Sequence, residues 1–69
     1  MPASDLSRRL NQVVDDLKAA NARLTRINDN WADPPQPDKP DVRAALDAVK
    51  AQAAIAVRLA DGMIGRLGV

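Results

Sequence analysis

The chain has 69 residues, enough for one small domain whose core is marginal unless a disulfide, a metal or a second chain stabilises it. It contains no cysteine and no histidine, which excludes a disulfide framework and argues against an ordinary zinc site. We expect no bound metal or cofactor. Ten basic and nine acidic residues give a net charge of +1, so charge offers no reason to expect a nucleic acid or an anionic membrane as partner. Oligomerisation or a partner protein remains as the stabiliser.

The first predicted element is a helix over residues 5–31. Ser4 can cap this helix, and Asp5 in its first turn suits the positive end of the helix dipole. Its apolar residues recur in alternating steps of four and three, which is the spacing of a coiled-coil seam. The seam comprises Leu6, Leu10, Val13, Leu17, Ala20, Leu24, Ile27 and Trp31.

A proline-rich breaker follows at residues 33–40. Proline cannot sit inside a helix without loss of a hydrogen bond, and it forces the preceding residue toward extended geometry. We therefore expect a stiff loop, against whose prolines the only tryptophan packs to close the turn. The turn-packing residues are Trp31, Pro34, Pro35, Pro37 and Pro40.

The second predicted helix covers residues 41–67 and can begin at Pro40, with Asp38 as its N-cap, Pro40 and Asp41 in its first turn and Gly68 as its stop. Its seam repeats the steps of four and three. The seam residues are Val42, Leu46, Val49, Ala53, Ala56, Ala60, Met63 and Leu67. The two helices would each have about 27 residues and a length of roughly 40 Å.

Two matched helices with matched seams predict an all-α fold with one domain over residues 1–69, an antiparallel two-helix hairpin with coiled-coil-like packing. The large residues of the first helix would face the small Ala53, Ala56 and Ala60 of the second. The hairpin would assemble with copies of itself into a four-helix bundle or a larger helical array.

The C-terminal helix carries more apolar surface than one seam needs. Its additional residues predict a partner interface, because a helix that is apolar over most of its circumference is normally covered on most of it. The glycines either let another backbone approach or allow the helix end to fray. The predicted interface comprises Ile55, Val57, Leu59, Gly62, Ile64 and Gly65.

Catalysis is not expected, since Ser4 and Ser7 have no base nearby and the acidic residues fall on outward positions. A nucleic-acid-binding regulator stays an alternative, although carboxylates interrupt the basic residues of the first helix. Those basic residues are Arg8, Arg9, Lys18, Arg23 and Arg26, and the interrupting ones are Asp15, Asp16 and Asp29. A membrane-surface helix over residues 51–69 is a further alternative that the composition disfavours to the same degree, since the segment lacks an aromatic anchor and a strongly basic polar face.

The helix, Pro-x-x-Pro turn and helix, here Pro37-Asp38-Lys39-Pro40, resemble the needle subunits of type III secretion systems, which are small hairpins that polymerise helically. The resemblance covers the turn and the general layout, and the polar, aromatic-containing C-terminal helix of that family is missing. The layout is also similar to small two-helix RNA-binding plasmid regulators, but their RNA-contacting residues have no clear match. The first resemblance implies a secreted needle-like polymer as a further alternative.

The sequence therefore predicts a non-enzymatic structural or assembly protein that acts through helix–helix contacts with itself or with another helical protein. Candidate settings are a small virion, filament or secretion-machine component, or an adaptor or chaperone. We expect a cytoplasmic location or one within a virion or extracellular assembly, because no cleaved signal peptide and no transmembrane helix is apparent. The abundance of Ala, Arg, Asp and Pro is compatible with a high-GC bacterial or phage source.

Overall fold

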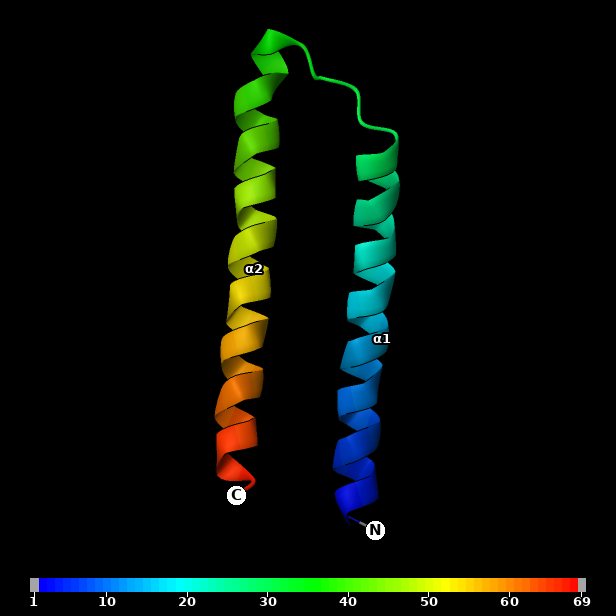
Figure 1. The fold of residues 1–69 in the computed structure, drawn as a ribbon, viewed down its shortest axis with the longest axis vertical. Helices are drawn as coiled ribbons and strands as arrows, with labels where there is room; N and C mark the ends of the chain where they lie inside the picture. Colours follow the sequence, from blue (N-terminus) through cyan, green and yellow to red (C-terminus); the bar gives the residue numbers. More distant parts are fainter. Residues whose placement is uncertain (1, 69) are drawn as a thin grey trace. The chain divides into compact units, whose positions relative to one another are not determined.

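The structure is a computed structural model that describes the backbone of residues 2–68 and the side chains of residues 5–68. It contains two long α-helices, α1 (Pro2–Asp29) and α2 (Lys39–Arg66), with a short 3-10 helix, η1 (Gln36–Asp38), before the second (Figure 1). Residues 2–68 contain no strand, so the described chain is all-α as predicted. The chain divides into two units, Met1–Ala32 and Asp33–Val69, each holding one long helix.

Helix α1 begins earlier and ends earlier than the predicted range of 5–31. It starts at Pro2, two residues before Ser4, so Ser4 lies within the helix and is not its N-cap; its side chain lies outside those described. Proline is well suited to a first helical position, because its missing N–H would have no acceptor there. Inside the helix, the Arg8 guanidinium donates to the Asp5 carboxylate at 2.7 Å, a pair that joins adjacent turns.

The end of α1 is a tightened turn around Asn30. Its backbone N–H and its side-chain amide both donate to the Arg26 carbonyl, at 3.1 and 3.0 Å. The next residue, Trp31, donates its N–H to the carbonyl of Asn28 at 3.3 Å, three residues back, and the α-helical pattern stops. The predicted helix end at residue 31 is therefore two residues too late.

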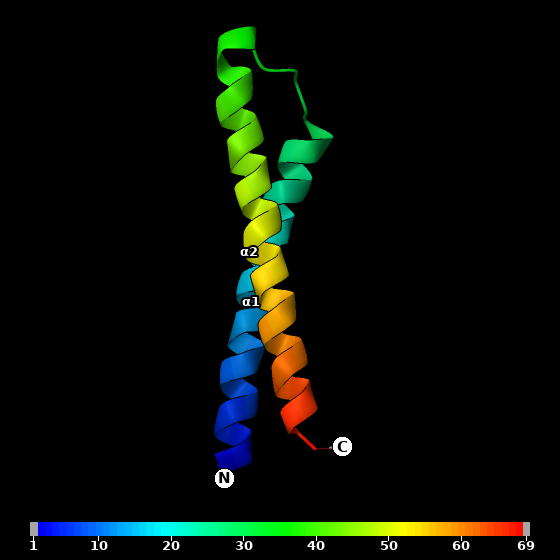
Figure 2. The same cartoon turned by 90° about the vertical axis from the view of Figure 1, so that its left-hand side faces the viewer.

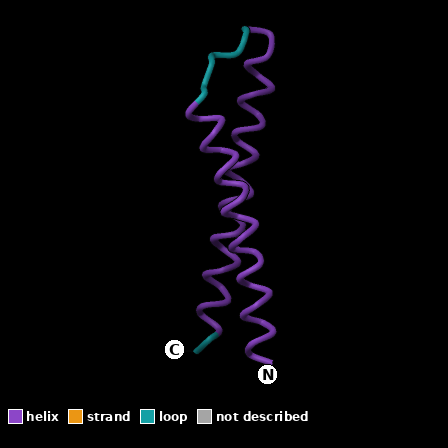
Figure 3. The backbone as a smooth tube through the Cα atoms, turned by 90° about the vertical axis from the view of Figure 1, so that its right-hand side faces the viewer, coloured by secondary structure: helices purple, strands orange, loops and turns teal. Residues whose placement is uncertain are grey.

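The segment that connects the two long helices covers residues 30–38 and includes the teal loop at the top of Figure 3. The predicted loop of residues 33–40 begins and ends later, because α1 already ends at Asp29 and because Lys39 and Pro40 belong to α2. Pro40 is tolerated in the first turn since the first N–H groups of a helix have no intrahelical acceptor. Within the segment, the Asp38 N–H donates to the Pro35 carbonyl at 2.9 Å. The Lys39 ammonium lies 3.2 Å from the Asp33 carboxylate, which ties the start of this segment to the first residue of α2.

Helix α2 is continuous from Lys39 to Arg66 and passes through both of its internal glycines (Figures 1 and 2). Asp38 occupies the predicted N-cap position but makes no side-chain capping hydrogen bond. Gly68 follows the C-cap Leu67 with φ +83°, the left-handed conformation that a glycine after a helix supplies without steric cost. The predicted glycine stop is confirmed, and the fraying that Gly62 and Gly65 could cause is not observed.

Candidate interaction surface

The described residues have no buried core. None of the side chains from residue 5 to 68 is buried, and the large apolar ones are exposed on both helices except Leu24 and Val42, which are half-buried. For the exposed ones on α2 and its C-cap, the exposed fraction runs from 41 % at Leu46, Val49 and Ile55 to 83 % at Leu67. Apolar surface of this extent is the main chemical feature of the molecule, so the candidate functional site is an interaction surface and not a cleft.

Helix α1 places its large apolar residues on one side. Six of the eight predicted seam residues expose between 44 and 56 % of their surface, and Val14 adds an exposed apolar residue beside them. The six are Leu6, Leu10, Val13, Leu17, Ile27 and Trp31, of which Trp31 lies two residues beyond the end of α1. Because the helix repeats every 3.6 residues, the five on α1 form one stripe, and the rest of the circumference is polar or charged apart from Val14 and small alanines such as Ala19 and Ala22. The helix is therefore amphipathic with a single apolar face.

Helix α2 is less one-sided, because its apolar residues occupy two stripes. One is the predicted seam, which the helix presents from Val42 to Leu67. The second lies roughly 130° around the helix from the first and is uncharged throughout, at about 100° of rotation per residue. We call it the second face; it consists of Ala44, Ala48, Ala51, Ile55, Leu59 and Gly62.

The six residues predicted as a partner interface fall into three groups on α2. Ile55, Leu59 and Gly62 lie on the second face, whereas Val57 and Ile64 lie on the opposite flank of the seam, 61 and 62 % exposed. Gly65 lies among the charged residues of the helix. The predicted interface is thus three surfaces, of which only the second face runs along most of the helix.

Three alanines of the second face, Ala44, Ala48 and Ala51, are absent from the predicted interface. They continue the spacing of Ile55 and Leu59 toward the N-terminus of α2 without any charge. A search for large apolar side chains misses these alanines, because an alanine contributes little apolar area. They can be recognised because uncharged residues recur along this stripe at steps of three and four.

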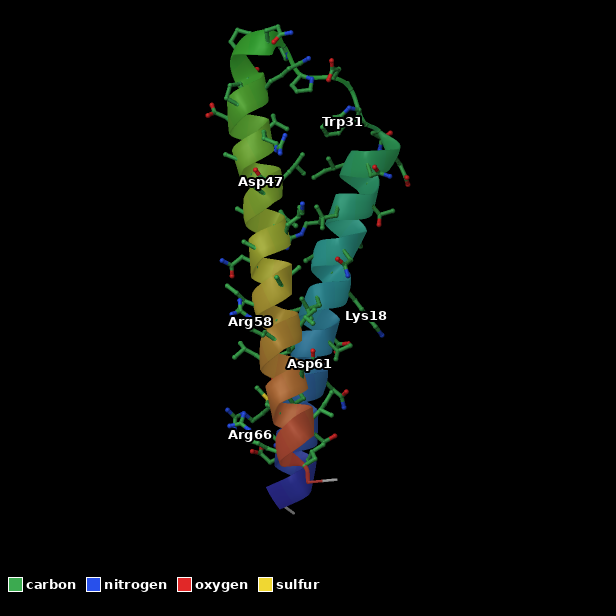
Figure 4. All side chains as sticks on the ribbon, turned by 60° about the vertical axis from the view of Figure 1, so that its left-hand side comes forward. Lys18, Trp31, Asp47, Arg58, Asp61 and Arg66 are labelled. Atoms are coloured by element: carbon green, nitrogen blue, oxygen red, sulfur yellow. The ribbon has the colours of Figure 1, made fainter. Side chains whose placement is uncertain are left out.

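Two arginines border the C-terminal half of the second face. Arg58 and Arg66 project from the same side of α2 (Figure 4), and no ion-pair partner for either lies among the described residues. Arg58 lines a shallow surface hollow together with Ile55 and Leu59. At the other end of the helix, the Asp47 carboxylate lies 3.3 Å from the Arg43 guanidinium, an exposed pair one turn apart.

The basic residues of α1 do not form a continuous positive stripe. Arg8 is paired with Asp5, and Asp15 lies between Arg8 and Arg26 on the same side of the helix. Lys18 extends away from α1 (Figure 4). The described side chains thus present mixed charge on this helix, which is typical of a solvated surface.

The turn-packing residues lie in different environments. Trp31 is 51 % exposed and directly follows the tightened end of α1, whereas Pro34 is half-buried and Pro35, Pro37 and Pro40 are exposed. The packing of Trp31 against these prolines stays a prediction.

Among the described residues, no group of three or more His, Cys, Asp or Glu side chains is placed to hold a metal ion. Within the same residues, neither helix has a stretch that is both long and apolar enough to cross a bilayer. Comparison of the chain with protein-family models, with curated proteins and with solved structures finds no match.

Proposed function

We propose that this protein is a non-enzymatic helical hairpin that acts through helix–helix contacts with a second protein chain. The observation that supports this most is the apolar surface of α2, which covers two stripes and leaves large side chains such as Leu59 58 % exposed. A helix with two apolar stripes needs two neighbours. A hairpin supplies one of them, and another chain has to supply the other.

The order of the seam residues supports the hairpin. Read outward from the turn, the two seams mirror each other step by step, as an antiparallel pair requires. In this register Leu17 of α1 faces Ala56 of α2, and Val13 faces Ala60. When a large residue of one helix packs against a small residue of the other, the two helix axes can come close together.

The hairpin register also accounts for one flank of α2. Val14 lies beside the seam of α1 and Val57 lies beside the seam of α2, on the flanks that face each other in an antiparallel pair. The hairpin can therefore cover Val57 but has nothing to place over the second face. That face, with Ile55 and Leu59, remains for the other chain.

The energetics favour covering these residues. Burial of one Leu, Ile or Val side chain contributes about 1.5–3 kcal/mol, so Ile55 and Leu59 together contribute roughly 3–6 kcal/mol. A domain of this length has a total stability on the order of 3–10 kcal/mol. Without a second chain, the hairpin would thus expose apolar side chains whose burial is worth a free energy comparable to the whole free energy of unfolding.

The test is a pair of variants that add the same charge to different sides of α2. Leu59→Asp places a carboxylate on the second face, whereas Ala54→Asp places one among the exposed charged residues. We expect Leu59→Asp to abolish concentration-dependent association in sedimentation equilibrium and Ala54→Asp to preserve it, with helicity followed by circular dichroism. A wild-type chain that stays a fully helical monomer at all concentrations would argue against self-association, and equal association of both variants would remove the second face from the interface.

A further inference from the structure

We propose that the occupant of the second face is the same face of α2 from a second copy, packed antiparallel with a two-fold axis close to the level of Ala53. This inference rests on the proposed function and names the partner and the register. An interface between identical chains related by a two-fold axis must be self-complementary, so that residue i meets residue j and residue j meets residue i. The second face meets that condition in both size and charge.

Size complementarity follows from the division of the second face into a small half and a large half. The N-terminal half is alanine at every position, whereas Ile55 and Leu59 protrude from the C-terminal half. Antiparallel pairing about Ala53 places the large half of each copy on the small half of the other. Ile55 then faces Ala51 of the second copy, Leu59 faces its Ala48, and Gly62 faces its Ala44.

The surface offers room for these contacts. The hollow lined by Ile55, Arg58 and Leu59 can receive a small side chain from the facing helix. A Cβ added at Gly62 would have no other atom within 4 Å in the chain, so the space above this glycine is open to a neighbouring backbone. Both features lie on the half of the face that meets alanines in the proposed pair.

Charge complementarity selects the same register independently. The pairing that brings Leu59 onto Ala48 also brings Arg58 beside Asp47 of the second copy and Arg66 beside its Asp41. Arg58 and Arg66 have no ion-pair partner among the described residues of their own chain, and both project from one side of α2 (Figure 4). Each of these pairs occurs twice in a two-fold dimer.

A parallel, in-register pair is disfavoured by the same residues. It would place each residue of α2 beside its own copy, with Leu59 on Leu59 and Ala48 on Ala48. The helices would be held apart at one end and leave a gap at the other, which protein interiors do not tolerate without cost. Arg58 could not reach Asp47 of the second copy, because these positions would lie roughly 16 Å apart along the axes of an in-register parallel pair.

Cysteine cross-linking tests the register directly, because the natural chain has no cysteine. We expect the double variant Ala48→Cys, Leu59→Cys to form a disulfide-linked dimer under mild oxidation, and an equimolar mixture of the two single variants to form the mixed dimer. Each single variant alone should link poorly, because residues 48 of the two copies would lie roughly 16 Å apart along the helix axis, beyond disulfide reach. Ala54→Cys, on the charged side, is the matched control.

The outcomes separate this inference from the proposed function. Association with efficient linkage of each single variant to itself would indicate a parallel pair and overturn the antiparallel register, while leaving helix–helix assembly intact. Association without linkage of the 48 and 59 positions, or growth into filaments instead of a closed dimer, would also overturn it. A helical monomer at every concentration would remove self-association and this interface with it.

A charge exchange gives a second measurement that needs no cross-link. Arg58→Asp would set a carboxylate beside Asp47 of the second copy, at two places in the dimer, and should raise the dissociation constant roughly fivefold. Combining it with Asp47→Arg should restore most of the affinity, because the contact again joins one positive and one negative side chain, with the two charges exchanged. A double variant that associates more weakly than both single variants would contradict the proposed pairing of these residues.

Discussion

Gly62 and Gly65 provide a matched pair of substitutions that distinguishes an intrinsic effect on the helix from an effect on assembly. Both lie inside α2, and a Cβ added at either has no other atom within 4 Å, so alanine fits at both positions in the single chain. Alanine is more favourable than glycine in a helix interior by about 1 kcal/mol, with a smaller gain at Gly65 because that position is next to the helix end. On the helix alone, both substitutions should therefore stabilise.

The two positions differ in what the proposed dimer brings near them. Gly65 lies on the charged side of α2, whereas Gly62 lies on the second face opposite Ala44 of the second copy. A methyl group added to a well-packed contact costs about 1–3 kcal/mol. We expect Gly62→Ala to raise the dissociation constant by a factor of about 5–150 for each of the two equivalent contacts in the dimer, and Gly65→Ala to leave it unchanged.

Sedimentation equilibrium measures the dissociation constants. Thermal unfolding, followed by circular dichroism at low and at high protein concentration, separates the effect of each substitution on the stability of the helix from its effect on dimer formation. The expected pattern is a higher melting temperature for Gly65→Ala at both concentrations, and for Gly62→Ala a gain at low concentration that is lost at high concentration. Equal or tighter association of Gly62→Ala would refute the close approach of a second backbone at Gly62.

Three further outcomes follow from the turn and the helix end. If the indole packs against the prolines, Trp31→Ala should lower the free energy of unfolding by about 1–2 kcal/mol, which corresponds to a fall in melting temperature of several degrees. An unchanged melting temperature would show that Trp31 does not stabilise the turn. Asp33→Ala removes the exposed pair with Lys39 and should cost less than about 1 kcal/mol in a urea titration; a larger loss would mean that this pair fixes the start of α2. Gly68→Ala forces a side chain into the left-handed region at about 1–2 kcal/mol, so NMR chemical shifts should report loss of the last helical turn near Arg66, and an intact turn would contradict the capping role of Gly68.

The two helices could be predicted from the sequence because their apolar spacing is regular over many turns, and Gly68 marked one end correctly. The remaining boundaries depended on local hydrogen bonds that the pattern does not contain. Asn30 doubles its bonds to the Arg26 carbonyl and ends α1, although Trp31 continues the apolar spacing. Pro40 lies in the first turn of α2, as predicted from the compatibility of proline with that position, but the helix begins one residue earlier, at Lys39.

The candidate surface was harder to predict than the helices. Large residues outside the seam pointed to a partner, and their spacing alone places Ile55 and Leu59 on one flank of the seam and Val57 and Ile64 on the other. Helix α2 is continuous through Gly62 and Gly65, so this division holds along the whole helix. The alanines of the second face carry almost no signal by themselves, since alanine is also the most favourable residue for an exposed helix position.

The difference between α1 and α2 also determines where assembly would stop. Helix α1 has one stripe of large apolar residues, with small alanines such as Ala19 and Ala22 on its other sides, so in the proposed hairpin its contact with α2 covers that stripe. Helix α2 has two apolar stripes, and the proposed dimer pairs the second face with itself. A pair of hairpins joined through α2 would thus place the two α2 helices at the centre and the two α1 helices outside. Since neither outer helix presents a second stripe of large apolar residues, the proposed assembly would close at two chains instead of extending into a filament.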